Sequence, residues 1–112
     1  LQQRYVPDLD QLRILLLRLP GLTVTLEGHT DAQGSASYNR ALSEARARKC
    51  RQYLLSDPRI APARVRAVGY GAARPVASND DDAGRAKNRR TVASLNYLYE
   101  FTPPNSGEAL PP

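Results

Sequence analysis

The first third of the chain alternates between apolar and polar residues with two different periods. Leucines in residues 9–16 recur every three or four positions, which predicts an amphipathic helix, and Asp8 before them is a candidate N-cap. The Pro20–Gly21 pair that follows is a stop signal for this helix. Residues 22–26 then alternate strictly between apolar and polar, which predicts a strand with one buried face.

The remaining sequence predicts a longer helix, two more strands and one short helix. Residues 37–55 have helical spacing, and residues 65–68 alternate as a second strand. The acidic run at residues 80–82 is suited to cap a short helix over residues 83–89. Residues 91–101 carry alternating apolar positions and predict the last strand.

This order of elements predicts an α/β (α+β) two-layer sandwich, with helices packed on one face of a mixed sheet. A clipped or degenerate first strand is expected near residues 4–6. The 112 residues suffice for one domain, which we assign to residues 1–101. Residues 102–112 hold four of the nine prolines and are expected to be a flexible tail.

Composition excludes several classes of site. Cys50 is the only cysteine and His29 the only histidine, so neither a disulfide within the chain nor a site of several thiolates or imidazoles can form. We therefore expect no metal and no cofactor, and interpret Cys50 as a small buried core residue. The longest apolar stretch, residues 14–17, is far shorter than the roughly 18–20 residues that span a bilayer. A net charge of +5 indicates an anionic partner, without choosing among nucleic acid, acidic lipid and cell wall.

The helix predicted over residues 37–55 has polar side chains where core residues are expected. At about 100° per residue, one direction is charged and faces solvent, and it contains Arg40, Glu44, Arg48, Arg51 and Gln52. In the second half of the helix the opposite direction carries Cys50, Tyr53 and Leu54. In its first half the same direction carries Asn39, Ser43 and Arg46.

A guanidinium that faces the protein needs a partner, so Arg46 must meet a carboxylate, backbone carbonyls or a ligand. One reading is an internal ion pair that fixes the helix to a neighbouring loop. The other is a cleft in which Arg46 binds a ligand carboxylate through two hydrogen bonds. Asp31 lies in a glycine-bracketed turn just after a strand and can accept an ammonium. Together the two side chains are suited to a zwitterionic amino-acid group.

The second basic cluster, residues 84–90, has a nucleic-acid patch as its alternative interpretation. Two features disfavour that interpretation. The acidic residues 80–82 directly precede the cluster and repel phosphates, and no aromatic side chain is interleaved with it for base stacking. An enzyme is also disfavoured, because no Ser-His-Asp or Cys-His arrangement is present and Arg46 near Asp31 would keep that carboxylate ionised. We expect no catalytic residues and no nucleic-acid partner.

Four linked motifs in these segments resemble the OmpA-like peptidoglycan-binding family, which includes domains of OmpA, MotB and Pal. The motifs are Gly28-His29-Thr30-Asp31 with Gly34; Tyr38-Asn39-x-x-Leu42-Ser43-x-x-Arg46-Ala47; Val68-Gly69-Tyr70-Gly71 with Pro75 and Asn79; and Gly84-Arg85-x-x-Asn88-Arg89-Arg90. They occur in the family's order over roughly residues 21–96. Departures include Cys50 in place of an apolar residue and Thr91 in place of the usual valine.

The resemblance implies a β-α-β-α-β-β fold and non-covalent binding of peptidoglycan through the diaminopimelate of its stem peptide. The family's aspartate and arginine correspond to Asp31 and Arg46, and its pocket also includes positions that correspond to Asn39, Arg89 and Thr30. His29 is interpreted as orienting the loop rather than contacting the ligand.

The resemblance further implies a setting in the periplasm of a Gram-negative bacterium, attached to the outer membrane or cell envelope. There the domain would anchor a parent protein whose membrane segment lies outside this sequence. Whether the parent is a barrel, a lipoprotein, a motor stator or a secretion-system anchor is left open, as is a homodimer.

Overall fold

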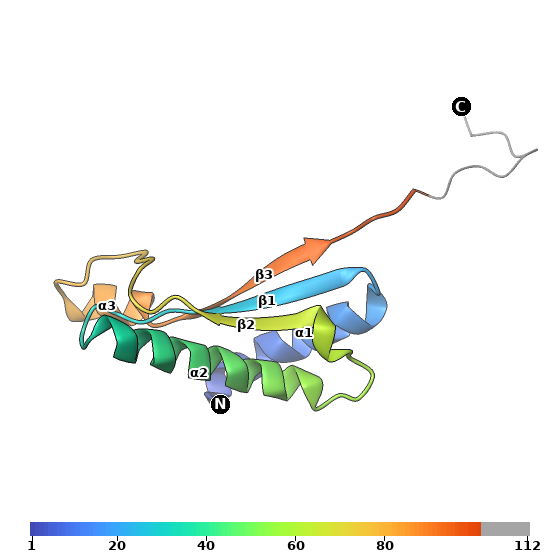
Figure 1. The fold of residues 1–112 in the computed structure, drawn as a ribbon, viewed down its shortest axis with the longest axis horizontal. Coiled ribbons are helices and arrows are strands. Elements are labelled where there is room, and N and C mark those ends of the chain that lie inside the picture. The colour runs from blue at the N-terminus through green and yellow to red at the C-terminus, as the bar shows by residue number, and fades with distance from the viewer. Residues whose placement is uncertain (102–112) are drawn as a thin grey trace, which may run out of the picture.

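The computed structural model describes residues 1–101 and shows a mixed sheet with helices on one side (Figure 1). In chain order the helices and strands are α1 (Val6–Arg18), β1 (Leu22–Gly28), α2 (Ala36–Leu55), β2 (Val65–Gly69), α3 (Asp82–Asn88) and β3 (Thr91–Tyr97). Single-turn 3-10 helices occupy Gln3–Tyr5 and Pro62–Arg64. The predicted proline-rich tail, residues 102–112, lies outside the described residues.

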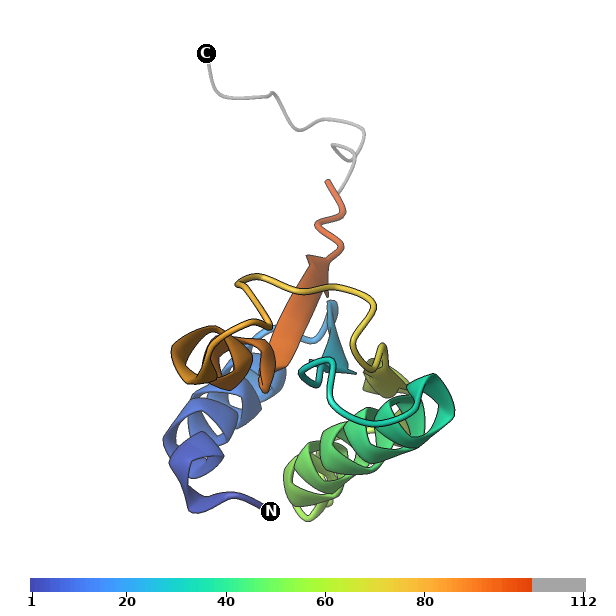
Figure 2. The ribbon, with the colours of Figure 1, turned by 90° about the vertical axis from the view of Figure 1, so that its left-hand side faces the viewer.

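The sheet has the strand order β2-β1-β3, with β1 parallel to β2 and antiparallel to β3. Leu22, Val24 and Leu26 alternate along β1 and are almost fully buried. Helices α1 and α2 contact each other and cover one face of the sheet, as Figure 2 shows. The predicted α+β two-layer sandwich with a mixed sheet is therefore confirmed.

The core is built from small and medium aliphatic side chains between the two helices and the sheet. Its buried apolar members are Leu9, Leu16, Leu22, Val24, Leu26, Ala47, Cys50, Leu54, Ile60 and Val65. Each fully buried leucine stabilises the fold by roughly 1.5–3 kcal/mol. Cys50 is buried among them as predicted, and burial raises the pKa of its thiol.

Side-chain caps begin the two helices that border the candidate site. Ser35 Oγ accepts a hydrogen bond from Tyr38 N at the start of α2, and Asp81 Oδ1 accepts one from Gly84 N at the start of α3. The prediction that the acidic run caps the short helix is confirmed. Asp8 is not an N-cap, because α1 already begins at Val6 and Asp8 lies in its first turn.

The prediction of a clipped first strand near residues 4–6 is wrong. Residues Gln3–Tyr5 form a 3-10 turn that runs directly into α1. Pro7 explains the difference, because its fixed φ and missing N–H suit the first turn of a helix. Within the described residues, the fold therefore starts with a helix instead of the first strand of the β-α-β-α-β-β order.

The end of β3 also differs from its prediction. The strand stops at Tyr97 rather than at residue 101, and its last residues are paired with Leu22 and Thr23 at the start of β1. Pairing partners on β1 therefore set the length of β3.

Among the described residues, no helix combines the length and the apolar character that crossing a membrane requires.

Candidate functional site

The candidate site forms where the ends of β1 and β2 meet the first half of α2. A Cβ on Gly28 would lie 2.1 Å from the carbonyl oxygen of Ser43, and one on Gly69 would lie 2.4 Å from Glu44 N. Ser43 Oγ donates to Arg40 O and accepts from Gly71 N, each at 2.9 Å. These glycines and Ser43 therefore allow the strand ends to contact the backbone of α2. The loop that follows β1 then lies next to the first turns of α2.

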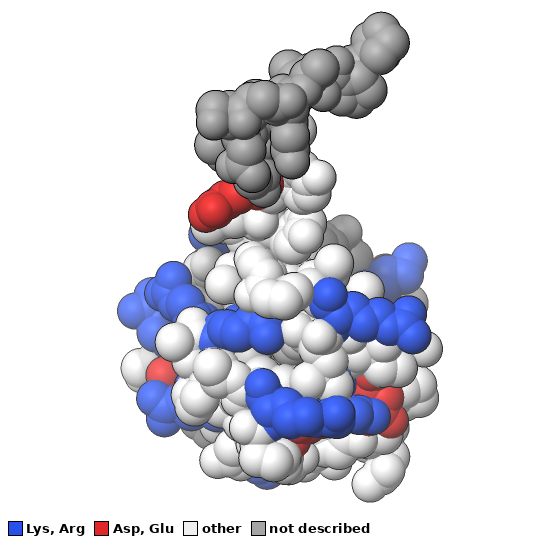
Figure 3. Space-filling model, turned by 90° about the vertical axis from the view of Figure 1, so that its right-hand side faces the viewer, with Lys and Arg blue, Asp and Glu red and all other residues white. Residues whose placement is uncertain are grey.

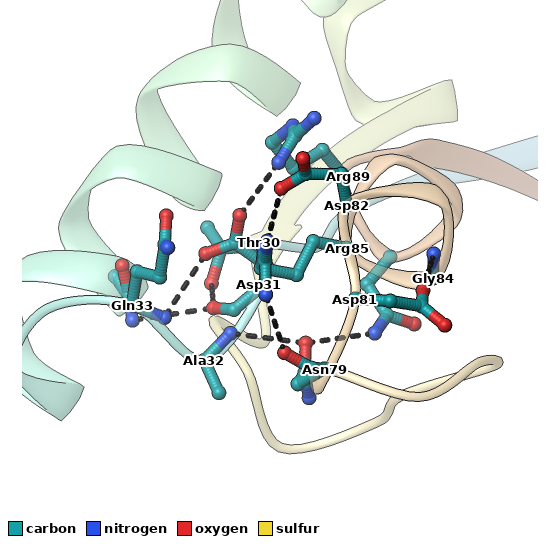
Figure 4. Close-up of polar contacts among 12 residues, drawn as sticks. Thr30, Asp31, Ala32, Gln33, Asn79, Asp81, Asp82, Gly84, Arg85 and Arg89 are labelled. Carbon is teal, nitrogen blue, oxygen red and sulfur yellow. Dashed lines mark hydrogen bonds and ion pairs between the residues drawn. The ribbon is translucent and has the colours of Figure 1, made fainter.

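Asp31 lies in this loop, with a carboxylate that is only 9% exposed. Its Oδ1 accepts a hydrogen bond from Gln33 N at 3.0 Å, and its Oδ2 accepts one from Arg89 Nη1 at 2.7 Å (Figure 4). The hydrogen bond from Arg89, followed by that from Gln33 N, lowers the pKa of Asp31 below its ordinary value of 3.8. Asp31 is therefore a carboxylate at neutral pH.

Thr30 and Asn39 hold the backbone of Asp31 rather than its carboxylate. Thr30 Oγ1 donates to Asp31 O at 2.9 Å, and Asn39 Nδ2 donates to the same oxygen at 3.4 Å. Both side chains are buried. The structure thus brings these two predicted site residues together with Asp31 and gives them positions from which they orient it.

Arg46 lies further along α2 and is half-buried. The buried stripe of α2 follows Asn39, Ser43, Ala47, Cys50 and Leu54. Arg46 is thus at the edge of this stripe, less buried than helical geometry predicted, because the stripe passes through Ala47. It is about 10 Å along the axis from Asn39, since seven residues rise roughly 1.5 Å each.

The surroundings of Arg46 form a cavity of about 210 Å³ that is lined by Leu1, Gln2, Tyr5, Arg46, Lys49 and Cys50. Among the ion pairs within residues 1–101, none includes Arg46. The ion pair of Asp31 is made with Arg89 instead. With respect to residues 1–101, the Arg46 guanidinium therefore has no carboxylate partner and can bind an anionic group.

The arginines of the basic cluster, residues 84–90, are engaged in contacts within the protein. Arg89 pairs with Asp31, and Arg85 pairs with Asp82 and donates to Asn79 O at 2.9 Å. Arg90 Nη2 donates to Arg74 O at 3.0 Å. Other Lys and Arg side chains lie at the opposite end of the molecule (Figure 3). The cluster is therefore part of the loop scaffold rather than a continuous free basic surface.

Two asparagines complete the site, and their roles were not predicted from the sequence. Asn88 is fully buried and binds the backbone of the segment that follows β2. Asn79 Oδ1 accepts hydrogen bonds from Asn88 Nδ2 at 2.9 Å and from Ala32 N at 3.2 Å. Both residues occur in the sequence motifs, but only the fold shows that they connect α3 to the Asp31 loop.

His29 precedes this loop and is buried against Tyr70, with ring centroids 5.5 Å apart. Burial, assisted by the positive charge of Arg90, lowers the pKa of His29. Its backbone N–H donates to Arg90 O at 2.9 Å. His29 thus packs against Tyr70 as a ring that is neutral at pH 7. Residues 1–101 contain no cluster of three or more His, Cys, Asp or Glu side chains suited to a metal ion.

Sequence comparison places this arrangement among known proteins. A model described as the OmpA family matches residues 1–89. The chain is 46% identical over 88 residues to outer membrane porin F of Pseudomonas fluorescens. The matched segment covers 79% of the chain and 27% of the porin. It is 45% identical over 74 residues to the peptidoglycan-associated lipoprotein of Pseudomonas aeruginosa, covering 66% of the chain and 44% of the lipoprotein. The chain thus spans less than half the length of these two relatives.

Solved structures share the fold. The peptidoglycan-associated lipoprotein from Burkholderia pseudomallei matches with a TM-score of 0.80 and 32% identity, over 86% of this chain and 80% of that one. The cell wall anchor of the type VI secretion system (T6SS) from Pseudomonas aeruginosa matches with a TM-score of 0.71 and 29% identity, over 88% and 70% of the two chains.

Proposed function

The chain belongs to the OmpA family, and on this premise we propose that it binds peptidoglycan without covalent linkage and anchors a parent protein to the bacterial cell wall. The names of two similar proteins support this function, one a peptidoglycan-associated lipoprotein and the other a cell wall anchor. The proposal places the domain in the periplasm of a Gram-negative bacterium, as part of a protein held in the envelope.

The ligand group that fits the site best is the zwitterionic end of diaminopimelate in the stem peptide. The observation that carries this proposal is the buried, ionised carboxylate of Asp31 with the Arg89 guanidinium beside it. A ligand ammonium binds Asp31, and the ligand carboxylate binds Arg89 and the guanidinium of Arg46. Replacement of the internal Asp31–Arg89 ion pair by these three contacts with the ligand favours groups that carry both charges.

Asn39 and Thr30 belong to the proposed site through their hydrogen bonds to the backbone of Asp31. A site held in position before the ligand arrives loses less conformational freedom on binding. The proposal assigns no catalytic step to these residues. A carboxylate with a lowered pKa is a weak base at neutral pH, and it has no proton to donate.

Co-sedimentation with insoluble peptidoglycan tests this function against the nucleic-acid alternative. The wild-type protein is expected to sediment with purified peptidoglycan and to release no soluble fragments after long incubation. Steady release of fragments would instead identify an enzyme. Salt-sensitive binding to DNA that persists in the Asp31→Ala variant would favour the nucleic-acid function and contradict the proposal.

Arg46→Lys tests whether Arg46 binds a ligand carboxylate in the geometry of a guanidinium. Lysine keeps the charge but cannot make two parallel hydrogen bonds to one carboxylate, so we expect roughly a tenfold loss of affinity for soluble stem-peptide fragments. Arg48→Lys is the matched control, since Arg48 is exposed on the same helix and pairs with Glu44. Equal affinities of Arg46→Lys and wild type in a calorimetric titration would exclude a contact in which Arg46 makes two hydrogen bonds to a ligand carboxylate.

The lowered pKa of Asp31 predicts how this side chain contributes to stability as pH changes. Because the folded-state pKa lies below the ordinary value of 3.8, the contribution is fully present above pH 3.8 and is lost as pH falls through the lower folded-state value. Urea unfolding of the wild type and Asp31→Asn should show a constant difference in free energy from pH 7 to about 5. That difference should shrink only in stronger acid, and a loss near pH 6 would contradict the ion pair with Arg89.

A further inference from the structure

The peptide group between Asp31 and Ala32 is held from two sides by different parts of the fold. Its carbonyl oxygen accepts from Thr30 Oγ1 at 2.9 Å and from Asn39 Nδ2 at 3.4 Å. Its N–H donates to Asn79 Oδ1 at 3.2 Å, across the gap between two loops that Figure 4 shows. Both polar ends of the peptide unit that carries Asp31 are therefore fixed.

The orientation of the Asn79 amide follows from its partner, Asn88. The Oδ1 atom of Asn88 accepts from Val76 N at 2.8 Å and from Ala77 N at 3.1 Å. Since those two groups are backbone donors, the other end of the Asn88 amide is its NH2 group, and this end faces Asn79 at 2.9 Å. Asn79 meets donors from both Asn88 and Ala32, so only an oxygen fits between them.

Asn88 is fully buried and immediately precedes Arg89 in the chain. Its contacts with Ala77 and Asn79 tie the end of α3 to the segment after β2. The same asparagine pair thus links the backbone of Asp31 to the residue next to Arg89.

We propose that Asn79 is a positioning residue for peptidoglycan binding, whose Oδ1 holds the Asp31–Ala32 peptide so that the Asp31 carboxylate faces the ligand. The inference rests on the proposed function. Without an acceptor at residue 79, the Ala32 N–H loses its partner in the protein, and the peptide group is held only through its carbonyl oxygen. In the free protein the Asp31 carboxylate then adopts several orientations. Affinity for the ligand falls because binding must first order the loop.

The test compares variants that remove the acceptor with one that keeps it. Asn79→Leu preserves side-chain size and Asn79→Ala removes it, and both abolish the acceptor oxygen. Asn79→Asp retains an oxygen that accepts from Ala32 N and Asn88 Nδ2. The matched control is Asn96→Leu, because Asn96 is exposed on β3 and its side chain is remote from the loop.

Affinity for soluble peptidoglycan fragments is measured by calorimetry, and protection of the Ala32 amide by hydrogen exchange with NMR detection. Asn79→Leu and Asn79→Ala are expected to lose affinity about tenfold, the effect of one or two hydrogen bonds, with faster exchange at Ala32. The affinity of Asn79→Asp should stay within about twofold of the wild-type affinity, and its Ala32 amide should stay protected. If any substitution at residue 79 disrupted the loop, Asn79→Asp would instead lose both.

Wild-type affinity in Asn79→Leu and Asn79→Ala would overturn the inference and leave the proposed function standing. Equal losses in Asn79→Asp and Asn79→Ala would also overturn it, because the acceptor would then be irrelevant. If wild type itself fails to bind peptidoglycan, the proposed function fails. In that case an unprotected Ala32 amide in wild type overturns the positioning contact as well, whereas loss of protection only in Asn79→Ala supports that contact.

Discussion

Asp31→Asn is expected to abolish detectable co-sedimentation with peptidoglycan while the protein stays folded. The substitution keeps size and an oxygen that can accept from Gln33 N, but removes the negative charge that the ligand ammonium needs. Loss of one partner from a largely desolvated charge pair costs about 3 kcal/mol, so affinity should fall roughly a hundredfold or more. Both arginines proposed for the site remain in place, and the positive field they create then repels the ammonium.

The folded state should tolerate this substitution. The Asp31 carboxylate is buried, but its partner Arg89 is 43% exposed and can turn toward water. Asp80→Asn is the matched control for charge, because Asp80 is exposed in the neighbouring loop. Circular dichroism should show the same fold for both variants, and only Asp31→Asn should remain in the supernatant. Normal co-sedimentation of Asp31→Asn would exclude Asp31 as the ammonium-binding group.

Gly28→Ala is expected to destabilise the fold strongly. The added Cβ would lie 2.1 Å from Ser43 O and 2.8 Å from Ser43 C, both backbone atoms of α2. Neither atom can move unless the helix separates from the end of β1, where the core is closely packed. Overpacking of this kind costs about 3 kcal/mol or more. In a domain of this size, the midpoint of thermal unfolding should fall by roughly 15 °C.

Thr23→Ala provides the comparison within the same strand. Thr23 is exposed on the face of β1 that points away from the helices, so its replacement should change the free energy of unfolding by less than about 1 kcal/mol. Thermal unfolding followed by circular dichroism measures both variants. A shift for Gly28→Ala no larger than that for Thr23→Ala would mean that strand and helix are not in backbone contact.

Much of the fold was predictable because its signals are local. The alternation in residues 22–26 defined β1, and Pro20–Gly21 marked the end of the preceding helix. The beginning of the chain was predicted less well. Residues 4–6 have a composition that also suits a strand, whereas Pro7 favours the first turn of a helix. A segment of three residues is too short for periodicity to decide between the two.

The candidate site was predictable only in part, because ion pairs join residues that are distant in sequence. The motifs identified Asp31, Asn39 and Arg89, and the structure brings these three together. The periodicity of α2 predicted a buried Arg46, but the buried stripe passes through Ala47 and leaves Arg46 at its edge. The hydrogen bond between Asn79 and Ala32 joins residues 47 positions apart and depends on the loop conformation. Helical or strand periodicity therefore cannot predict it.

The most direct test of the proposed ligand is a calorimetric titration of the wild-type protein with two muropeptides. One carries diaminopimelate in its stem peptide, and the other carries lysine at the same position. Lysine supplies the ammonium for Asp31 but no second carboxylate for Arg46 and Arg89, so these two arginines gain no ligand partner. The proposed site predicts binding of the diaminopimelate muropeptide at least about tenfold tighter than the lysine form. Equal affinities for the two would contradict recognition of a zwitterionic group by Asp31 and these arginines.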